Sequence, residues 1–171
     1  MNHPLRHTDE VRATELVAWY VENRRDLPWR AEPGELADPY AVLVSELMCQ
    51  QTRVQTAAPY FERWMARWPT LQALANAHVD DVLQMWTGLG YYRRARHLLA
   101  AAQQAIAEHG QLPADHAALL QLRGVGPYTA AALASLGFGL PCALVDGNVS
   151  RVLARWFAID VDVSRGPGNR E

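Results

Sequence analysis

Apolar residues recur at helical spacing along most of this chain, and Pro and Gly residues interrupt that spacing at short intervals. Alternating polar and apolar residues, the pattern of a half-buried strand, do not occur over a useful length. The chain is therefore predicted to be all-α. The pattern predicts helices at about 9–25, 39–53, 59–67, 70–77, 79–86, 91–109, 115–121, 127–136 and 147–158.

The composition is that of an ordinary globular domain. Half of the 171 residues are hydrophobic, and the formal net charge of −2 does not indicate a nucleic-acid or membrane partner, so any DNA site must be local. The two cysteines, Cys49 and Cys142, predict neither a disulfide framework nor a Cys-based metal cluster within this chain. No stretch is apolar enough for a signal sequence or a membrane span, so we expect a cytoplasmic protein.

The segment YAVLVSELMCQQTR, residues 40–53, contains a carboxylate among apolar residues. On a helix, Glu46 lies one turn from Val42, Leu43 and Cys49, which places it on a face that should be buried. Burial raises a carboxyl pKa, so Glu46 could hold a proton near neutral pH and act as a general acid. The alternative is a Glu that reaches solvent or pairs with a buried Arg, and this helix alone favours that alternative.

The segment LQLRGVGPYTAAAL, residues 120–133, predicts a helix-hairpin-helix. A short helix ends before the turn of Gly124, Val125 and Gly126, and a second helix begins at Pro127. Main-chain amides in such a turn can bind a phosphate without reading base sequence. A purely structural Gly-rich turn is the alternative.

The segment ALVDGNVSRVLAR, residues 143–155, places Asp146 just before a helix. Taken alone, Asp146 is best interpreted as an ordinary N-cap. Backbone amides and the positive helix end would also keep its carboxylate ionised, and an ionised carboxylate could stabilise a cation formed on a substrate. One protonated and one charged carboxyl would resemble the division of roles in glycoside hydrolysis.

The segment WTGLGYYRRARHLL, residues 86–99, combines a Gly turn, two tyrosines and basic residues. Basic side chains beside aromatic ones suit a phosphate backbone and a wedge that enters a base stack. A solvated helix face with core tyrosines remains the alternative. The basic residues are Arg93, Arg94, Arg96 and His97.

Together with LPWR, these segments resemble the adenine DNA glycosylase (MutY) family of the helix-hairpin-helix glycosylase superfamily, in motif order and spacing, over about residues 19–157. The resemblance implies a six-helix barrel lobe at 29–140, with the hairpin at about 115–136, and an incomplete second helical lobe. Residues 1–28 would supply that lobe's first helix. Residues 141–171 would begin the return to it, truncated or disordered after about 160.

The resemblance also implies the reaction. A monofunctional glycosylase would flip adenine, mispaired with 8-oxoguanine or guanine, out of duplex DNA and hydrolyse its N-glycosidic bond in base excision repair. Glu46 would protonate adenine N7, and Asp146 would stabilise the sugar cation. The other residues that match family positions are Tyr128 and Asn148 beside the acids, Trp29 and Arg30 near the adenine, Gln51 and Tyr91 in the base stack, and Gly124, Val125 and Gly126 at a phosphate.

Two other functions stay open at this stage. An endonuclease III-like glycosylase/lyase would need a Lys where this chain has Tyr128, and a non-catalytic helix-hairpin-helix remnant would bind DNA without releasing a base. The resemblance further implies a 4Fe-4S cluster in the full-length family, whose Cys ligands this chain lacks, and a monovalent cation at the hairpin. No other metal is expected, the partner would be double-stranded DNA, and the protein would be a monomer.

Overall fold

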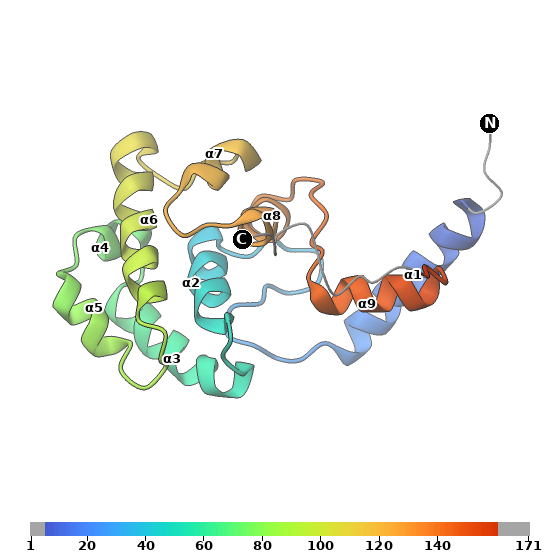
Figure 1. Ribbon diagram of the computed structural model, residues 1–171, viewed down its shortest axis with the longest axis horizontal. Helices are drawn as coiled ribbons and strands as arrows, with labels where there is room; N and C mark the ends of the chain where they lie inside the picture. The colour runs from blue at the N-terminus through green and yellow to red at the C-terminus, as the bar shows by residue number, and fades with distance from the viewer. Residues whose placement is uncertain (1–5, 161–171) are drawn as a thin grey trace.

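The computed structural model describes residues 6–160, and all regular structure within them is helical (Figure 1). The all-α prediction is confirmed. None of the described helices is long and apolar enough to cross a membrane. The elements are α1 (Arg6–Asn23), α2 (Pro39–Cys49), α3 (Val54–Arg67), α4 (Leu71–Ala75), α5 (Val79–Met85), α6 (Arg93–His109), α7 (His116–Gln121), α8 (Pro127–Ala132), the π-helix η1 (Leu133–Gly137) and α9 (Gly147–Trp156).

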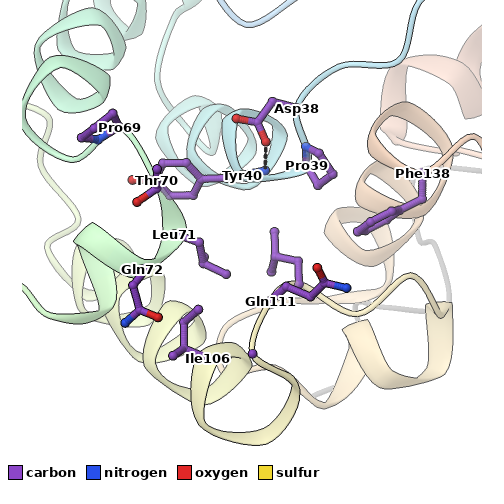
Figure 2. A pocket seen from close by; sticks show the side chains of 12 residues that line it. Asp38, Pro39, Tyr40, Pro69, Thr70, Leu71, Gln72, Ile106, Gln111 and Phe138 are labelled. Carbon is purple, nitrogen blue, oxygen red and sulfur yellow. Dashed lines mark hydrogen bonds between the residues drawn. The ribbon is translucent and has the colours of Figure 1, made fainter.

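Helix α2 is the central element of the larger helical body, where it packs against α3, α6, α8 and η1 (Figure 1). Leu43 and Val44 are fully buried, as expected of a helix that is apolar on nearly every side. Asp38 caps the helix as predicted, because its carboxylate accepts a hydrogen bond from the Tyr40 N–H at 3.0 Å (Figure 2). Pro39 follows at a position that needs no amide donor.

Aromatic side chains fill the core beside α2. The rings of Trp64 and Trp86 meet edge to face at 5.6 Å, and Trp68 contacts Trp64 in the same manner at 4.7 Å. Trp64 Nε1 donates to the Tyr40 hydroxyl, which donates to the carbonyl of Trp68. The polar groups inside this cluster are therefore paired, as burial requires.

Most predicted helix boundaries differ from the observed ones by a few residues, and the differences at the end of α2 and the start of α3 have a clear physical reason. Helix α2 ends at Cys49 rather than at residue 53, because Gln51 adopts a left-handed conformation with φ of 57°. Helix α3 begins at Val54 rather than at Pro59, so that Pro59 lies inside the helix. Pro is unfavourable there because it removes a backbone donor, yet burial of Ala57 and other side chains of the helix outweighs that loss.

Helices α1 and α9 extend away from the larger body (Figure 1). The guanidinium of Arg12 lies 5.7 Å from the ring centroid of Trp156. Several of their large apolar side chains are exposed, including Trp19 at 59% and Val152 at 52%. The division into lobes stays a prediction, and the predicted disorder after residue 160 concerns residues outside those described.

The helix-hairpin-helix consists of α7, α8 and the turn between them. Asp115 caps α7, and Val125 is buried at the centre of the turn. Gly124 has a φ of 77°, whereas Gly126 has a φ of −88° that any residue can adopt. A Cβ atom on Gly124 would also lie 2.4 Å from the Cβ of His97. The turn therefore requires glycine at Gly124 for both conformation and space.

This asymmetry predicts unequal effects of alanine in the turn. Gly124→Ala should lower the free energy of unfolding by more than about 1 kcal/mol, since the new methyl group meets both a positive φ and the His97 side chain. Gly126→Ala, with open space around the new methyl group, should change it by less than about 0.5 kcal/mol. Thermal melts of the two variants measure the difference. Equal losses would show that the turn does not depend on Gly124.

Candidate active site

Glu46 faces a cavity of about 670 Å³. The cavity lies between α2, the start of α8, the segment that follows α1 and the segment that leads into α9. Glu46 is half-buried, whereas Ser45 and Leu47 on either side of it in the sequence are buried. Among the residues that line the cavity are Trp29, Arg30, Ser45, Glu46, Tyr128, Leu144 and Val149.

The environment of Glu46 disfavours its charged form. Burial is the main cause and the negative charge of Asp146 the second, and together they raise the pKa of Glu46 from 4.5 to about 7. A carboxyl with this pKa is substantially protonated at neutral pH. It can therefore donate a proton to a molecule in the cavity.

Asp146 is held in the opposite protonation state. Its Oδ1 accepts hydrogen bonds from the backbone N–H groups of Val149 at 2.7 Å and Asn148 at 2.9 Å, and its Oδ2 accepts one from Asn148 Nδ2 at 3.0 Å. The bond from Val149 is the largest cause that lowers the pKa of Asp146. Asp146 therefore caps α9 and remains ionised.

Tyr128 stands at the start of α8 beside both acids. Burial, followed by the charges of Glu46 and Asp146, raises the pKa of its phenol to about 12. The phenol therefore stays protonated and can donate a hydrogen bond. The hairpin thus presents a hydroxyl, and not an amine, at the position beside the two carboxyl groups.

The mouth of the cavity includes residues that the motifs did not indicate. Arg24 forms an ion pair with Glu32 at 2.5 Å and donates to the carbonyl of Ala31. Tyr20, from α1, lies with its ring centroid 5.5 Å from the guanidinium of Arg30. No local pattern marked Arg24 or Glu32, because their pairing requires the segment after α1 to fold back.

The predicted site residues fall into two groups. Glu46, Tyr128, Trp29 and Arg30 line the cavity, and Asp146 interacts electrostatically with Glu46 and Tyr128. Asn148 holds the carboxylate of Asp146 but does not line the cavity. The second group comprises Gln51, Tyr91, Gly124, Val125 and Gly126, which lie in turns outside the cavity.

In the basic cluster of residues 93–97, Arg94 is not placed as the sequence predicted. Arg94 is only 7% exposed, so it is not a free cation for a phosphate. Its terminal nitrogens donate to main-chain carbonyls instead, including those of Leu47 and Leu89. His97 is half-buried against Gly124, whereas Arg93 and Arg96 are exposed. The prediction that the basic side chains of this cluster contact a phosphate backbone is therefore wrong for Arg94.

A second cavity, of about 360 Å³, lies at the other end of α2 (Figure 2). Asp38 is its only carboxylate, and that group is engaged in capping α2. The floor includes Leu71 and Ile106. This cavity lacks the pair of contrasting carboxyl groups, so we assign the chemistry to the cavity of Glu46.

The chain does not supply the ligands of an iron-sulfur cluster. It contains two cysteines, and the described residues hold no group of three or more His, Cys, Asp or Glu side chains that could bind a metal ion. Cys49 lies near Glu46, and burial raises the pKa of its thiol to about 11, whereas a metal ligand must be a thiolate. Residues 6–160 therefore do not fit such a cluster.

The structure thus combines a helix-hairpin-helix, whose Tyr128 interacts with both acids, with a protonated carboxyl at a cavity and an ionised carboxyl near it. Such a pair of carboxyl groups is suited to breaking glycosidic bonds. A sequence profile of the HhH-GPD superfamily, described as base excision DNA repair protein, matches residues 44–166. The chain belongs to this superfamily.

Its relatives include proteins named adenine DNA glycosylase. The human protein is 47% identical over 170 residues, which cover 95% of this chain and 31% of the relative. The Mycobacterium tuberculosis protein is 45% identical over 143 residues, covering 83% of this chain and 46% of the relative. The resemblance inferred from the motifs is confirmed, and this chain spans less than half the length of these two relatives.

Solved structures agree on the fold. A thermostable thymine-DNA glycosylase superimposes with a TM-score of 0.75 at 27% identity, covering 84% of this chain and 65% of that one. A non-covalent endonuclease III-DNA complex gives 0.68 at 24% identity, covering 84% and 66%, which supports the fold alone.

The raised pKa of Glu46 predicts a pH-dependent stability. The folded protein binds the Glu46 proton more tightly than the unfolded chain does, so protonation of Glu46 favours folding. This contribution to the free energy of unfolding is fully present below about pH 4.5 and is lost as pH rises through about 7. Glu46→Gln removes the ionisation, so the variant should be more stable than the wild type at pH 8, by up to roughly 3 kcal/mol. The difference should shrink to about 1 kcal/mol or less at pH 5, close to the ordinary pKa of 4.5.

Urea unfolding at the two pH values measures this difference. Asp146→Asn is the matched variant, because the pKa of Asp146 is lowered and its charge stabilises the fold at both pH values. It should be destabilised at both. A Glu46→Gln variant that is no more stable than the wild type at pH 8 would contradict a buried, protonated Glu46.

Proposed function

We propose that this protein is a monofunctional DNA glycosylase that removes adenine mispaired with 8-oxoguanine or guanine from duplex DNA. The observation that carries the proposal is the pairing of Glu46 and Asp146, two carboxyl groups in opposite protonation states, beside a cavity lined by Glu46. The names of the relatives support adenine as the base. That the adenine is mispaired with 8-oxoguanine or guanine is an expectation that rests on the resemblance of the motifs.

The reaction follows from the two carboxyl groups. An adenine extruded from the duplex enters the cavity, where Glu46 transfers its proton to N7. The bond between C1′ and N9 then breaks, and its electron pair leaves with the base. Asp146 stabilises the positive charge that develops on the sugar, and a water oxygen bonds to C1′ while its proton passes to a carboxylate. The products are free adenine and an abasic site.

Tyr128 and Asn148 act on the two acids in this scheme. Asn148 fixes the Asp146 carboxylate through a 3.0 Å hydrogen bond. Tyr128 offers a phenol that keeps its proton, so it can orient Glu46 or the base. It cannot form a Schiff base with the sugar, which disfavours the lyase reaction. Trp29 and Arg30 line the cavity where the base would lie.

The DNA contacts belong to the exposed turns. Gln51 and Tyr91 would enter the base stack, and amides of the turn from Gly124 to Gly126 would hold a phosphate. A monovalent cation at the hairpin carbonyls stays a prediction. Double-stranded DNA is thus the proposed partner, bound through local groups rather than through net charge, which is −2.

Single-turnover assays on an 8-oxoguanine:A duplex test the proposal. The wild type should give strand breaks only after hot alkali, Glu46→Gln should give none, and Asp146→Asn should lose roughly 10³-fold or more. The DNA affinity of Glu46→Gln should stay near that of the wild type. Strand breaks without alkali would indicate a lyase, and binding without any release of adenine would indicate a binding module.

The rate should also depend on pH in a defined direction. Because the protonated form of Glu46 is the acid, the single-turnover rate should fall above about pH 7, approaching tenfold per pH unit. Measurements from pH 5.5 to 9 at saturating protein give this profile. A rate that is flat or rising between pH 7 and 9 would contradict the role of Glu46 as the proton donor.

A further inference from the structure

Three exposed residues in the described part of the chain have a backbone conformation that is rare for anything but glycine, and two of them lie in turns next to α2 and α6, whereas the third, Ala158, follows α9. Gln51, in the turn after α2, has a φ of 57°, and Tyr91, in the turn before α6, has a φ of 48°. Tyr91 is 66% exposed. Such conformations persist only where surrounding groups fix them, and they cluster at functional positions.

A single buried side chain fixes both turns. Arg94, from the first turn of α6, reaches between them with its guanidinium. Its two terminal nitrogens hold the turn of Gln51 and the turn of Tyr91 at the same time. Nη1 donates to the carbonyls of Leu47 (3.0 Å), Met48 (2.9 Å) and Gln50, and Nη2 donates to Thr52 Oγ1 (3.1 Å) and to the carbonyls of Leu89 (3.2 Å) and Gly90 (3.2 Å).

The chemistry of these contacts requires arginine. The last carbonyls of a helix lack intrahelical partners and form its negative end, so those of α2 attract a cation. A guanidinium presents donors in a planar fork, whereas a lysine ammonium is a single compact point. The guanidinium carbon also lies 5.4 Å from the ring centroids of Tyr91 and Trp86, which adds a direct cation–π contact to the exposed Tyr91.

We propose that Arg94 is a positioning residue that joins the turn of Gln51 and the turn of Tyr91 into one rigid wedge, so that both side chains enter the base stack together. The proposal rests on the proposed function, because it assumes that a base is extruded from the duplex. Movement of either turn would break its hydrogen bonds to a guanidinium that also binds the other turn. The two side chains should therefore act as a coupled pair rather than independently.

Base extrusion can be measured without catalysis. The probe is a duplex with 2-aminopurine opposite 8-oxoguanine, whose fluorescence rises when the analogue leaves the stack. Arg94→Lys keeps the charge but loses the fork. It should reduce the fluorescence rise at saturating protein at least about fivefold, while DNA affinity changes less than about threefold. Arg67→Lys is the matched control, a surface guanidinium 5.8 Å from the Trp68 ring, and should leave the rise unchanged.

Coupling is measured with Gln51→Ala and Tyr91→Ala. In the wild-type background, the double variant should lose little more extrusion than either single variant, and in the Arg94→Lys background neither substitution should add a loss. A full fluorescence rise with Arg94→Lys overturns the proposal. Single-variant losses that multiply in the wild-type background overturn it as well.

Two further measurements keep the outcome unambiguous. If Arg94→Lys does not fold in a thermal melt, Thr52→Val carries the test, because it removes the Oγ1 acceptor of Arg94 together with a 3.4 Å hydrogen bond from that hydroxyl to the Gln50 carbonyl. That variant should reduce the fluorescence rise in the same direction, and an unchanged rise overturns the proposal. Release of adenine is assayed separately from base extrusion. A wild type that extrudes the base but releases no adenine would refute the proposed glycosylase function, and the role of Arg94 in extrusion would still be tested.

Discussion

The exclusion of water from α2 is the constraint on which the rest of the structure depends. Its side chains are mostly buried against α3, α6, α8 and η1, and Glu46 is the ionisable residue of α2 among those that line the cavity of about 670 Å³. A carboxyl in that position favours its neutral form because the interior solvates a charge poorly. The same packing that stabilises the fold therefore keeps the proposed proton donor neutral, and both properties would be lost together if α2 were exposed to solvent.

The carboxylate of Asp146 is kept ionised by hydrogen bonds at the start of a helix rather than by the packing of the core. Asp146 caps α9 with two backbone hydrogen bonds, so the start of a helix keeps it ionised close to Glu46. Asp146 also acts on Glu46, since the negative charge of Asp146 contributes to the raised pKa of Glu46. Two environments thus separate the protonation states of chemically similar groups. This separation is what acid-assisted cleavage of a glycosidic bond requires.

Features of the structure that depend on a few adjacent residues were predictable from the sequence. The cap at Asp38, the hairpin turn and the cap at Asp146 all follow from a few adjacent residues, and the structure has them where the sequence indicates. The end of α2 was not predictable in this way, because the left-handed Gln51 depends on a guanidinium 43 positions further along the chain. The pair of Arg24 and Glu32 was missed for the same reason.

The central claim is that Glu46 carries a proton near neutral pH because burial and Asp146 keep it neutral. Carbon-13 NMR of labelled glutamate side chains, with the Glu46 signal assigned by comparison with Glu46→Gln, measures this pKa directly. Glu46 should titrate near pH 7, and its midpoint should be lower in Asp146→Asn, where the neighbouring negative charge is gone. A Glu46 that titrates near 4.5, or whose midpoint does not respond to Asp146, would contradict the central claim.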